Sequence, residues 1–268
     1  MIDRQEHRRE DPSWLAGAWG RARVLAVHDG RLAWLPGPEA APPGERIFLG
    51  LAEDKTPCFA VLAEVEGMLP LREVLMECDR DHDDRDLICS AAALAGWRES
   101  HRYHPGTGEP ISPAMAGWVQ RTEKGELVWP RINPAVLVLI HDGVPGPEGR
   151  LLLSRNVARP PDFRSITAGF VSPGESLETT VARESFEELG VTVRDVRYHS
   201  SESWPFNGEM MIGFVALADP QQSLVLDPAE IAEAAWYTRA EMLARDFTVP
   251  SRVSISGVMI EEWLDGQI

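Results

Sequence analysis

The segment from Gly169 to Val191 carries the charged residues whose types and spacing best suit chemistry. On a helix, Glu184 and Glu188 are four residues apart and Glu184 and Glu187 are three apart, so their carboxylates share one face. Like charges crowded in this way are tolerable when a divalent cation neutralises them, and hard oxygen ligands suit Mg²⁺ or Mn²⁺. The spacing therefore predicts a metal site, and the alternative is an ordinary solvated acidic helix face.

A helix is expected to carry these glutamates. Ser176 can cap it through its hydroxyl, Glu178 lies in the first turn near the positive end of the dipole, and Gly190 supplies a left-handed stop. Arg183 can pair its planar guanidinium with Glu175, which would pin the preceding loop to the helix.

The whole segment reads GFVSPGESLETTVARESFEELGV, which closely resembles the Nudix box, G-x5-E-x7-R-E-U-x-E-E-x-G-U, where U is a bulky apolar residue. Every charged and glycine position is filled, and the one departure is Ser185, where the pattern has an apolar residue. The resemblance implies a Mg²⁺- or Mn²⁺-dependent hydrolase of a nucleoside diphosphate linked to another moiety. It also implies an α/β (α+β) fold, the Nudix α/β/α sandwich with a mixed sheet.

A narrower resemblance follows the box. Residues 201–207 read SESWPFN and are similar to the S-Q-P-W-P-F-P element of the NADH pyrophosphatase branch, where that element forms part of the nicotinamide nucleotide pocket. The carboxylate of Glu202 stands in place of a neutral amide, which leaves the preferred dinucleotide open. The substrate-binding residues implied here are Glu202, Ser203, Trp204, Pro205, Phe206, Asn207, Gly208 and Glu209.

The likeness continues before the box. Residues 129–136, WPRINPAV, resemble the segment that leads into the first Nudix strand of this branch. There the aromatic at the position of Trp129 reaches into the partner subunit's site and stacks on the base. With Phe170, next to the first box glycine, it would sandwich the nicotinamide ring. This implies a homodimer.

Two segments after the box also match. Residues 229–237, AEIAEAAWY, resemble E-I-x-E-A-x-W-F, whose first glutamate, here Glu230, is an additional metal ligand. Residues 254–263, SISGVMIEEW, match the last helix of the branch, in which Ser256 takes the place of a small residue against the adenine nucleotide.

The resemblance also assigns roles within the box. Glu184, Glu187 and Glu188 would be the catalytic residues; Glu184, Glu188 and Glu230 would hold the metal, and Glu187 would be a ligand or an orienting base. The residues with a structural role would be Gly169, Glu175, Arg183 and Gly190.

The reaction implied is hydrolysis of a small-molecule dinucleotide, NAD(H), to AMP and nicotinamide mononucleotide. One alternative is a Nudix enzyme acting on ADP-ribose, a dinucleoside polyphosphate or an NAD-type RNA cap, and the net charge of −16 argues mildly against RNA. Another is a catalytically silent nucleotide sensor, against which the intact box glutamates argue.

One feature of the branch is missing. Its members usually carry a four-cysteine zinc ribbon just before the Nudix domain, and the corresponding residues here are 103–108, then Thr122 and Gly125. None of the four ligand positions is a cysteine, and one lone His104 cannot make a structural tetrahedral site. The sequence therefore predicts no zinc.

Composition sets the class of protein. The chain has 268 residues, 44% hydrophobic and 25% charged, typical of a globular protein. The charge of −16 disfavours indiscriminate binding to nucleic acid or anionic membranes. The first residues lack an apolar secretory segment and the aliphatic run 135–140 is too short to span a bilayer, so we expect a cytoplasmic protein without a membrane partner.

The expected organisation is an N-terminal α/β domain over 1–96, a degenerate zinc-ribbon-like linker over 97–130 and a Nudix domain over 131–268. The acidic run 79–86 is expected to be a solvated loop or a helix start. Strands are expected at 32–35, 46–51, 58–62, 135–140, 150–154, 193–200, 210–218 and 231–238. Helices are expected at 71–76, 87–97 and 254–263, besides the box helix.

Overall fold

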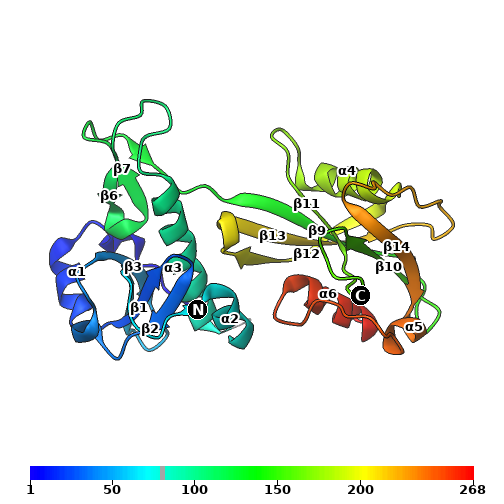
Figure 1. The fold of residues 1–268 in the computed structure, drawn as a ribbon, viewed down its shortest axis with the longest axis horizontal. Helices are drawn as coiled ribbons and strands as arrows, with labels where there is room; N and C mark the ends of the chain where they lie inside the picture. The colour runs from blue at the N-terminus through cyan, green and yellow to red at the C-terminus, as the bar shows by residue number, and fades with distance from the viewer. Residues whose placement is uncertain (79–81) are drawn as a thin grey trace. The chain divides into compact units, whose positions relative to one another are not determined.

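The computed structural model describes residues 1–78 and 82–268. The chain forms two compact units (Figure 1). The first contains Met1–Ile132 and Ser203–Gly208, and the second contains Asn133–Glu202 and Glu209–Ile268. Residues 97–130 group with the N-terminal residues, and the three-part division expected from the sequence stays a proposal.

In the described part of the first unit, one α-helix precedes a run of five strands and two α-helices follow it. Its elements are α1 (Pro12–Trp19), β1 (Arg23–His28), β2 (Arg31–Trp34), β3 (Glu45–Leu51), β4 (Pro57–Leu62), β5 (Leu69–Pro70), α2 (Leu71–Glu77) and α3 (Asp83–Ser100). Residues 79–81 of the acidic run lie outside the described residues, and α3 begins with the last acidic residues of that run. The helix expected at 87–97 thus starts earlier than the pattern indicates.

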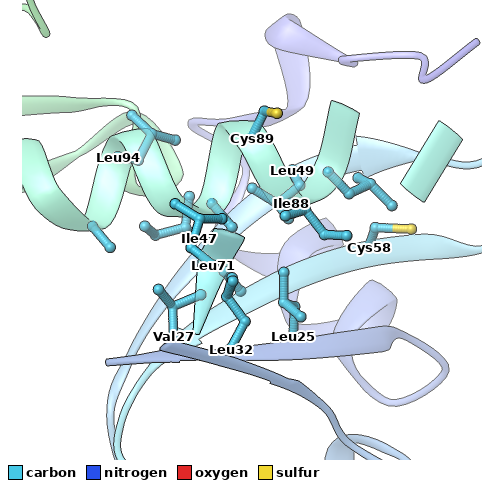
Figure 2. Packing of buried hydrophobic residues seen from close by; sticks show 14 of the residues in the cluster. Leu25, Val27, Leu32, Ile47, Leu49, Cys58, Leu71, Ile88, Cys89 and Leu94 are labelled. Carbon is cyan, nitrogen blue, oxygen red and sulfur yellow. The ribbon is translucent and has the colours of Figure 1, made fainter. Parts of the chain in front are cut away.

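The sheet of this unit has the order β3-β4-β1-β2-β5, with β1 and β4 parallel and the other neighbours antiparallel. Alternation along β1 divides its side chains between two cores. Leu25 and Val27 pack with residues of α2 and α3, as Figure 2 shows, whereas Val24 and Ala26 pack on the opposite face with Ala18 of α1.

Residues 101–132 include most of the segment that the sequence predicts to be a ribbon-like linker. They contain a three-stranded antiparallel sheet of β6 (Ser112–Ala114), β7 (Val119–Arg121) and β8 (Leu127–Val128). Its strands are only two or three residues long, which is why the sequence pattern there shows little periodicity.

The second unit is an α/β/α sandwich. Its elements are β9 (Asn133–His141), β10 (Arg150–Asn156), β11 (Thr167–Phe170), α4 (Leu177–Leu189), β12 (Arg194–Trp204), β13 (Glu209–Leu217), β14 (Ile231–Thr238), α5 (Arg239–Leu243) and α6 (Ile255–Leu264). The last two residues of β12 belong to the first unit by their contacts.

The sheet has the order β12-β13-β9-β10-β14, and β11 also pairs with β9. It is mixed, as expected, because β13 runs parallel to β9 while β10 and β11 run antiparallel to it. Alternation along β9 sends Val136 and Val138 to the α4 side and Leu137 and Leu139 to the α6 side. The two helices therefore cover opposite faces of the sheet (Figure 1). In the described part of the chain, every helix is too short or too polar to cross a membrane.

Candidate active site

Helix α4 positions the acidic residues. The Ser176 side chain accepts a hydrogen bond from the Thr179 N–H at 3.2 Å, which forms the expected N-terminal cap. Gly190 has φ 72°, and its N–H donates to the Phe186 carbonyl at 2.8 Å, which ends the helix in the left-handed conformation. The capped helix therefore holds Glu184, Glu187 and Glu188 on one rigid element, whereas Glu175 lies in the loop before it.

Ser185 is the box position that departs from the apolar pattern. It is fully buried, and its hydroxyl donates to the Val181 carbonyl one turn earlier at 2.7 Å. Because the hydroxyl is satisfied within the helix, the polar side chain is tolerated where an apolar one is usual.

Arg183 connects the loop before the helix to the acidic side chains on it. Its Nε and Nη2 donate to the two carboxylate oxygens of Glu175 at 2.7 and 2.9 Å. Its Nη1 also donates to Glu184 at 2.8 Å and to Glu187 at 3.0 Å, and Nη2 donates to the Phe170 carbonyl at 3.0 Å. The hydrogen bonds from Arg183 lower the pKa of Glu175 to about 2, and the same contacts raise the pKa of Arg183.

Gly169 lets the Glu184 carboxylate lie directly against strand β11. A Cβ added at Gly169 would lie 2.0 Å from Cδ of Glu184, so any side chain there would displace the carboxylate. Glu184 is buried, and burial raises its pKa, although Arg183 pulls in the opposite direction.

Glu188 is the most unusual acidic residue of the cluster. It is 6% exposed, and within the described residues its Oε2 has no hydrogen-bond partner. Burial, followed by the nearby charges of Glu184, Glu230 and Asp227, raises its pKa to about 8. A buried carboxylate oxygen without a partner is costly, and a cation would remove that cost.

The loop before β14 brings further acidic residues to the end of α4. The Asp227 N–H donates to the Glu188 carbonyl at 3.1 Å, and the Glu230 carbonyl accepts from the Val157 N–H at 2.8 Å. The sequence analysis did not single out Asp227. Its position could have indicated it, because Asp227 lies three residues before Glu230 and is followed by a proline.

The donor set fits Mg²⁺ or Mn²⁺ in its chemistry. Glu184 and Glu188 present buried carboxylates next to Glu230, and one Glu188 oxygen lacks a partner among the described residues. Among residues 1–78 and 82–268, however, no group of three or more His, Cys, Asp or Glu side chains is already arranged to hold a metal ion. Arg183 forms ion pairs with Glu184 and Glu187, so these carboxylates lie close together but are not arranged as ligands around one metal position.

The two aromatic side chains implied in stacking lie in different units. Trp129 is 54% exposed and follows β8 in the first unit, whereas Phe170 is 55% exposed and ends β11 in the second. Both rings therefore expose area on which a base or a nicotinamide could stack.

Residues 203–208 of the predicted substrate segment lie in the first unit. Phe206 packs against the core that includes Leu71, and the Trp204 and Phe206 rings are 5.1 Å apart. The Arg72 guanidinium lies 5.2 Å from the centre of the Phe206 ring, a cation–π distance. Pro205 is buried.

The rest of this segment includes a hydrogen bond to a backbone carbonyl and a tight turn. The Ser203 carbonyl accepts a hydrogen bond from the Cys89 thiol at 3.7 Å. Asn207 and Gly208 have φ 59° and 67°, so two consecutive left-handed residues reverse the chain before Glu209, the first residue of β13.

Glu202 and Ser256 both make hydrogen bonds at the first turn of α6. Glu202 is buried, and its carboxylate accepts from the Ile255 N–H at 2.8 Å. Ser256 is also buried, and its Oγ lies 3.1 Å from Oγ of Ser254, the N-cap residue. In this structure the Glu202 carboxylate is therefore bonded to a helix terminus.

The positions that correspond to the zinc ligands do not suit zinc. His104 Nδ1 accepts from the Gly106 and Thr107 N–H groups at 3.2 and 3.1 Å, which assigns the ring proton to Nε2. Nε2 contacts Glu126 at 3.2 Å, and Thr122 Oγ1 accepts from the Glu126 N–H at 3.1 Å. These turns are held by hydrogen bonds and offer no thiolate, so the donor chemistry does not fit a structural zinc.

Comparison with known proteins gives concordant matches. The NUDIX domain model matches residues 131–256. The chain is 38% identical to the NAD-capped RNA hydrolase NudC of Mycobacterium tuberculosis, over 97% of this chain and 92% of that protein. It is 29% identical to a mitochondrial NAD(P)H pyrophosphatase of Homo sapiens, over 76% of this chain and 61% of that protein. A crystal structure of a NUDIX hydrolase from Nitrosomonas europaea covers 61% of this chain and 90% of its own, with 18% identity and a TM-score of 0.48.

Proposed function

We propose that this chain, which belongs to the Nudix hydrolase family and to its NADH pyrophosphatase branch, hydrolyses the pyrophosphate bond of NAD(H) to nicotinamide mononucleotide and AMP. The observation that supports this most directly is Glu188. Its buried carboxylate has an oxygen without a partner among the described residues and lies beside Glu184, Glu230 and Asp227. Such a cluster is stable and useful when a divalent cation neutralises it.

Glu184, Glu188 and Glu230 would hold the cation, with Glu187 as a further ligand or orienting base. When bound, Mg²⁺ or Mn²⁺ would offset the charge of the pyrophosphate and lower the pKa of a water molecule, so that the water could lose a proton as it attacks phosphorus. A new P–O bond to the water oxygen forms, the bond to the bridging oxygen breaks, and the water proton leaves to a base. Arg183 keeps Glu184 and Glu187 oriented while it anchors Glu175.

The same bond also occurs at the 5′ end of an NAD-capped RNA. The relative that matches nearly the full length of this chain is named for that substrate, which makes capped RNA the second candidate. A homodimer in which Trp129 stacks on a base in the partner's site, and in which Phe170 contributes the opposite ring, belongs to the same proposal. Its support is the exposure of both aromatic side chains.

A substrate panel tests this function. Purified protein would receive NADH, NAD⁺, ADP-ribose, diadenosine polyphosphates and NAD-capped RNA with Mg²⁺ or Mn²⁺, and products would be identified by mass. We expect AMP and nicotinamide mononucleotide from NAD(H), and no product in EDTA. Preference for capped RNA would favour the second candidate. Binding of NADH without turnover of any substrate would favour a nucleotide sensor.

Glu188→Gln tests the assignment of the site. We expect turnover to fall on the order of 100-fold or more, because a neutral amide cannot hold the cation in the same way. Glu178→Gln, an exposed residue in the first turn of the same helix, is the matched control and should retain activity. Near-normal rates in Glu188→Gln, with an unchanged circular dichroism spectrum, would refute the assignment.

A further inference from the structure

Helix α6 has a negative side chain bonded at its N-terminal end. The first N–H groups of a helix lack partners inside the helix, and the dipole there is positive. The Glu202 carboxylate, from β12, accepts the Ile255 N–H at 2.8 Å, while Ser254 caps the same turn from the chain itself. A carboxylate is a stronger acceptor in this place than the neutral amide of a glutamine.

A second contact ties the other half of α6 to the same strand. His199 of β12 and Glu262 of α6 are joined through Nε2 and Oε2 at 2.5 Å. The two strand positions are three residues apart, which spans about 10 Å at ~3.3 Å per residue. Ile255 and Glu262 are seven residues apart, which spans about 10.5 Å at ~1.5 Å per residue. The two contacts therefore join β12 to the first residue of α6 and to its last turns, and together they hold the helix in one register.

Close packing beneath the helix supports the same register. A Cβ added at Gly213 of β13 would lie 2.7 Å from the Met259 sulfur and 3.0 Å from Cδ1 of Ile255. The helix thus lies against the β13 backbone at a glycine, and a shift along the strand would bring it against larger side chains.

We propose that Glu202 is a positioning residue: with His199 it sets the register of α6 and so places the turn that carries Ser256, instead of contacting the nicotinamide nucleotide itself. The proposal rests on the proposed function only in its consequence for substrate binding. Its structural part is independent of that function. It also explains how a carboxylate at position 202 is accommodated, because the carboxylate accepts a hydrogen bond from the N-terminal end of α6.

Amide hydrogen exchange without substrate tests the structural part. In Glu202→Ala we expect the amides at 255–257 to exchange about tenfold faster or more, because a charge-assisted hydrogen bond is lost. Glu202→Gln keeps an acceptor and should restore most of the protection. Glu262→Ala removes the acceptor of His199 and should loosen the last turn of α6 while the first turn keeps its protection. Unchanged exchange at 255–257 in Glu202→Ala would overturn the proposal.

Kinetics with the full-length protein test the consequence. We expect Glu202→Ala to raise KM for the dinucleotide about fivefold or more with little change in kcat, because the acidic cluster on α4 is untouched. Glu261→Ala, on the same helix, is the control and should match the wild type. If Glu202→Gln instead changes the preference between NADH and NAD⁺ with normal exchange at 255–257, Glu202 contacts substrate and the proposal is wrong. If no protein turns over any dinucleotide, the proposed function fails while the exchange result still decides the role of Glu202.

Discussion

Arg183 is the residue that organises the acidic cluster. One guanidinium bonds Glu175, Glu184 and Glu187 and also a backbone carbonyl of β11. Lysine could not make these contacts together, because they require several donors in one plane. The orientation of Glu175, Glu184 and Glu187 therefore depends on a residue that need not touch substrate.

Glu175→Gln is expected to lower the melting temperature at pH 7 in EDTA, because an amide loses the two-point ion pair with Arg183. The folded pKa of Glu175, about 2, lies below its usual value of 4.5. Its stabilisation is therefore complete above pH 4.5 and is lost as the pH falls through 2. The difference between wild type and variant should stay constant down to pH 4.5 and shrink as the pH falls from 4.5 toward 2, followed by circular dichroism during heating. A constant difference over that range would contradict the ion-pair role.

Gly169→Ala is expected to reduce turnover on the order of 100-fold, because the new Cβ would occupy the space of the Glu184 carboxylate. The affinity for Mn²⁺, measured by titration calorimetry, should fall as well. Ala168→Ser, at the preceding exposed position, serves as the control. Wild-type activity in Gly169→Ala would show that the position of Glu184 against β11 is not needed.

At the level of elements, the sequence predicted those with strong periodicity. The strands near 135–140, 210–218 and 231–238 and the helix at 254–263 are confirmed as β9, β13, β14 and α6 within one or two residues at most ends. In the first unit, α1 and β1 were not expected, although Asp11 caps α1 and proline stands at its start. Their apolar residues show no clear helical or strand spacing in so short a run, so packing on the sheet decides their structure.

The turns at His104 and Thr122, at the positions that correspond to the zinc ligands, lead to a prediction at the level of elements. His104→Ala is expected to destabilise the first unit by about 0.5–1.5 kcal/mol, because two solvent-exposed backbone N–H groups lose their acceptor. Lys124→Ala removes only an exposed ion pair with Glu109 and should have no measurable effect. Chelators should leave the melting curve of the wild type unchanged, and metal analysis should find no zinc. Stoichiometric zinc, or a chelator-induced loss of stability, would overturn this.

At the level of the whole molecule, the sequence does not indicate where residues 203–208 belong. They stand between two strands of the second unit, yet their contacts place them with the first. Phe206 packs on a core whose buried members, apart from Val128, lie more than a hundred residues earlier, and such a non-local contact is encoded neither by spacing nor by composition. The box, by contrast, is local, and this is why its charged positions could be identified from the chain alone.

The net charge of −16 leads to a prediction that separates the two candidate substrates. An acidic protein repels a long polyanion more strongly than a small dinucleotide, and salt screens that repulsion over a Debye length of about 8 Å at physiological ionic strength. At fixed Mg²⁺, raising KCl from about 20 to about 150 mM should therefore increase kcat/KM for NAD-capped RNA relative to kcat/KM for NADH, measured in parallel assays. If the protein bound RNA through a local patch of basic residues, kcat/KM for capped RNA would instead fall with salt, because counterion release makes such binding weaker in salt. A steep loss of activity on capped RNA with rising salt would thus show that local arginines outweigh the overall charge, and would contradict the expected repulsion.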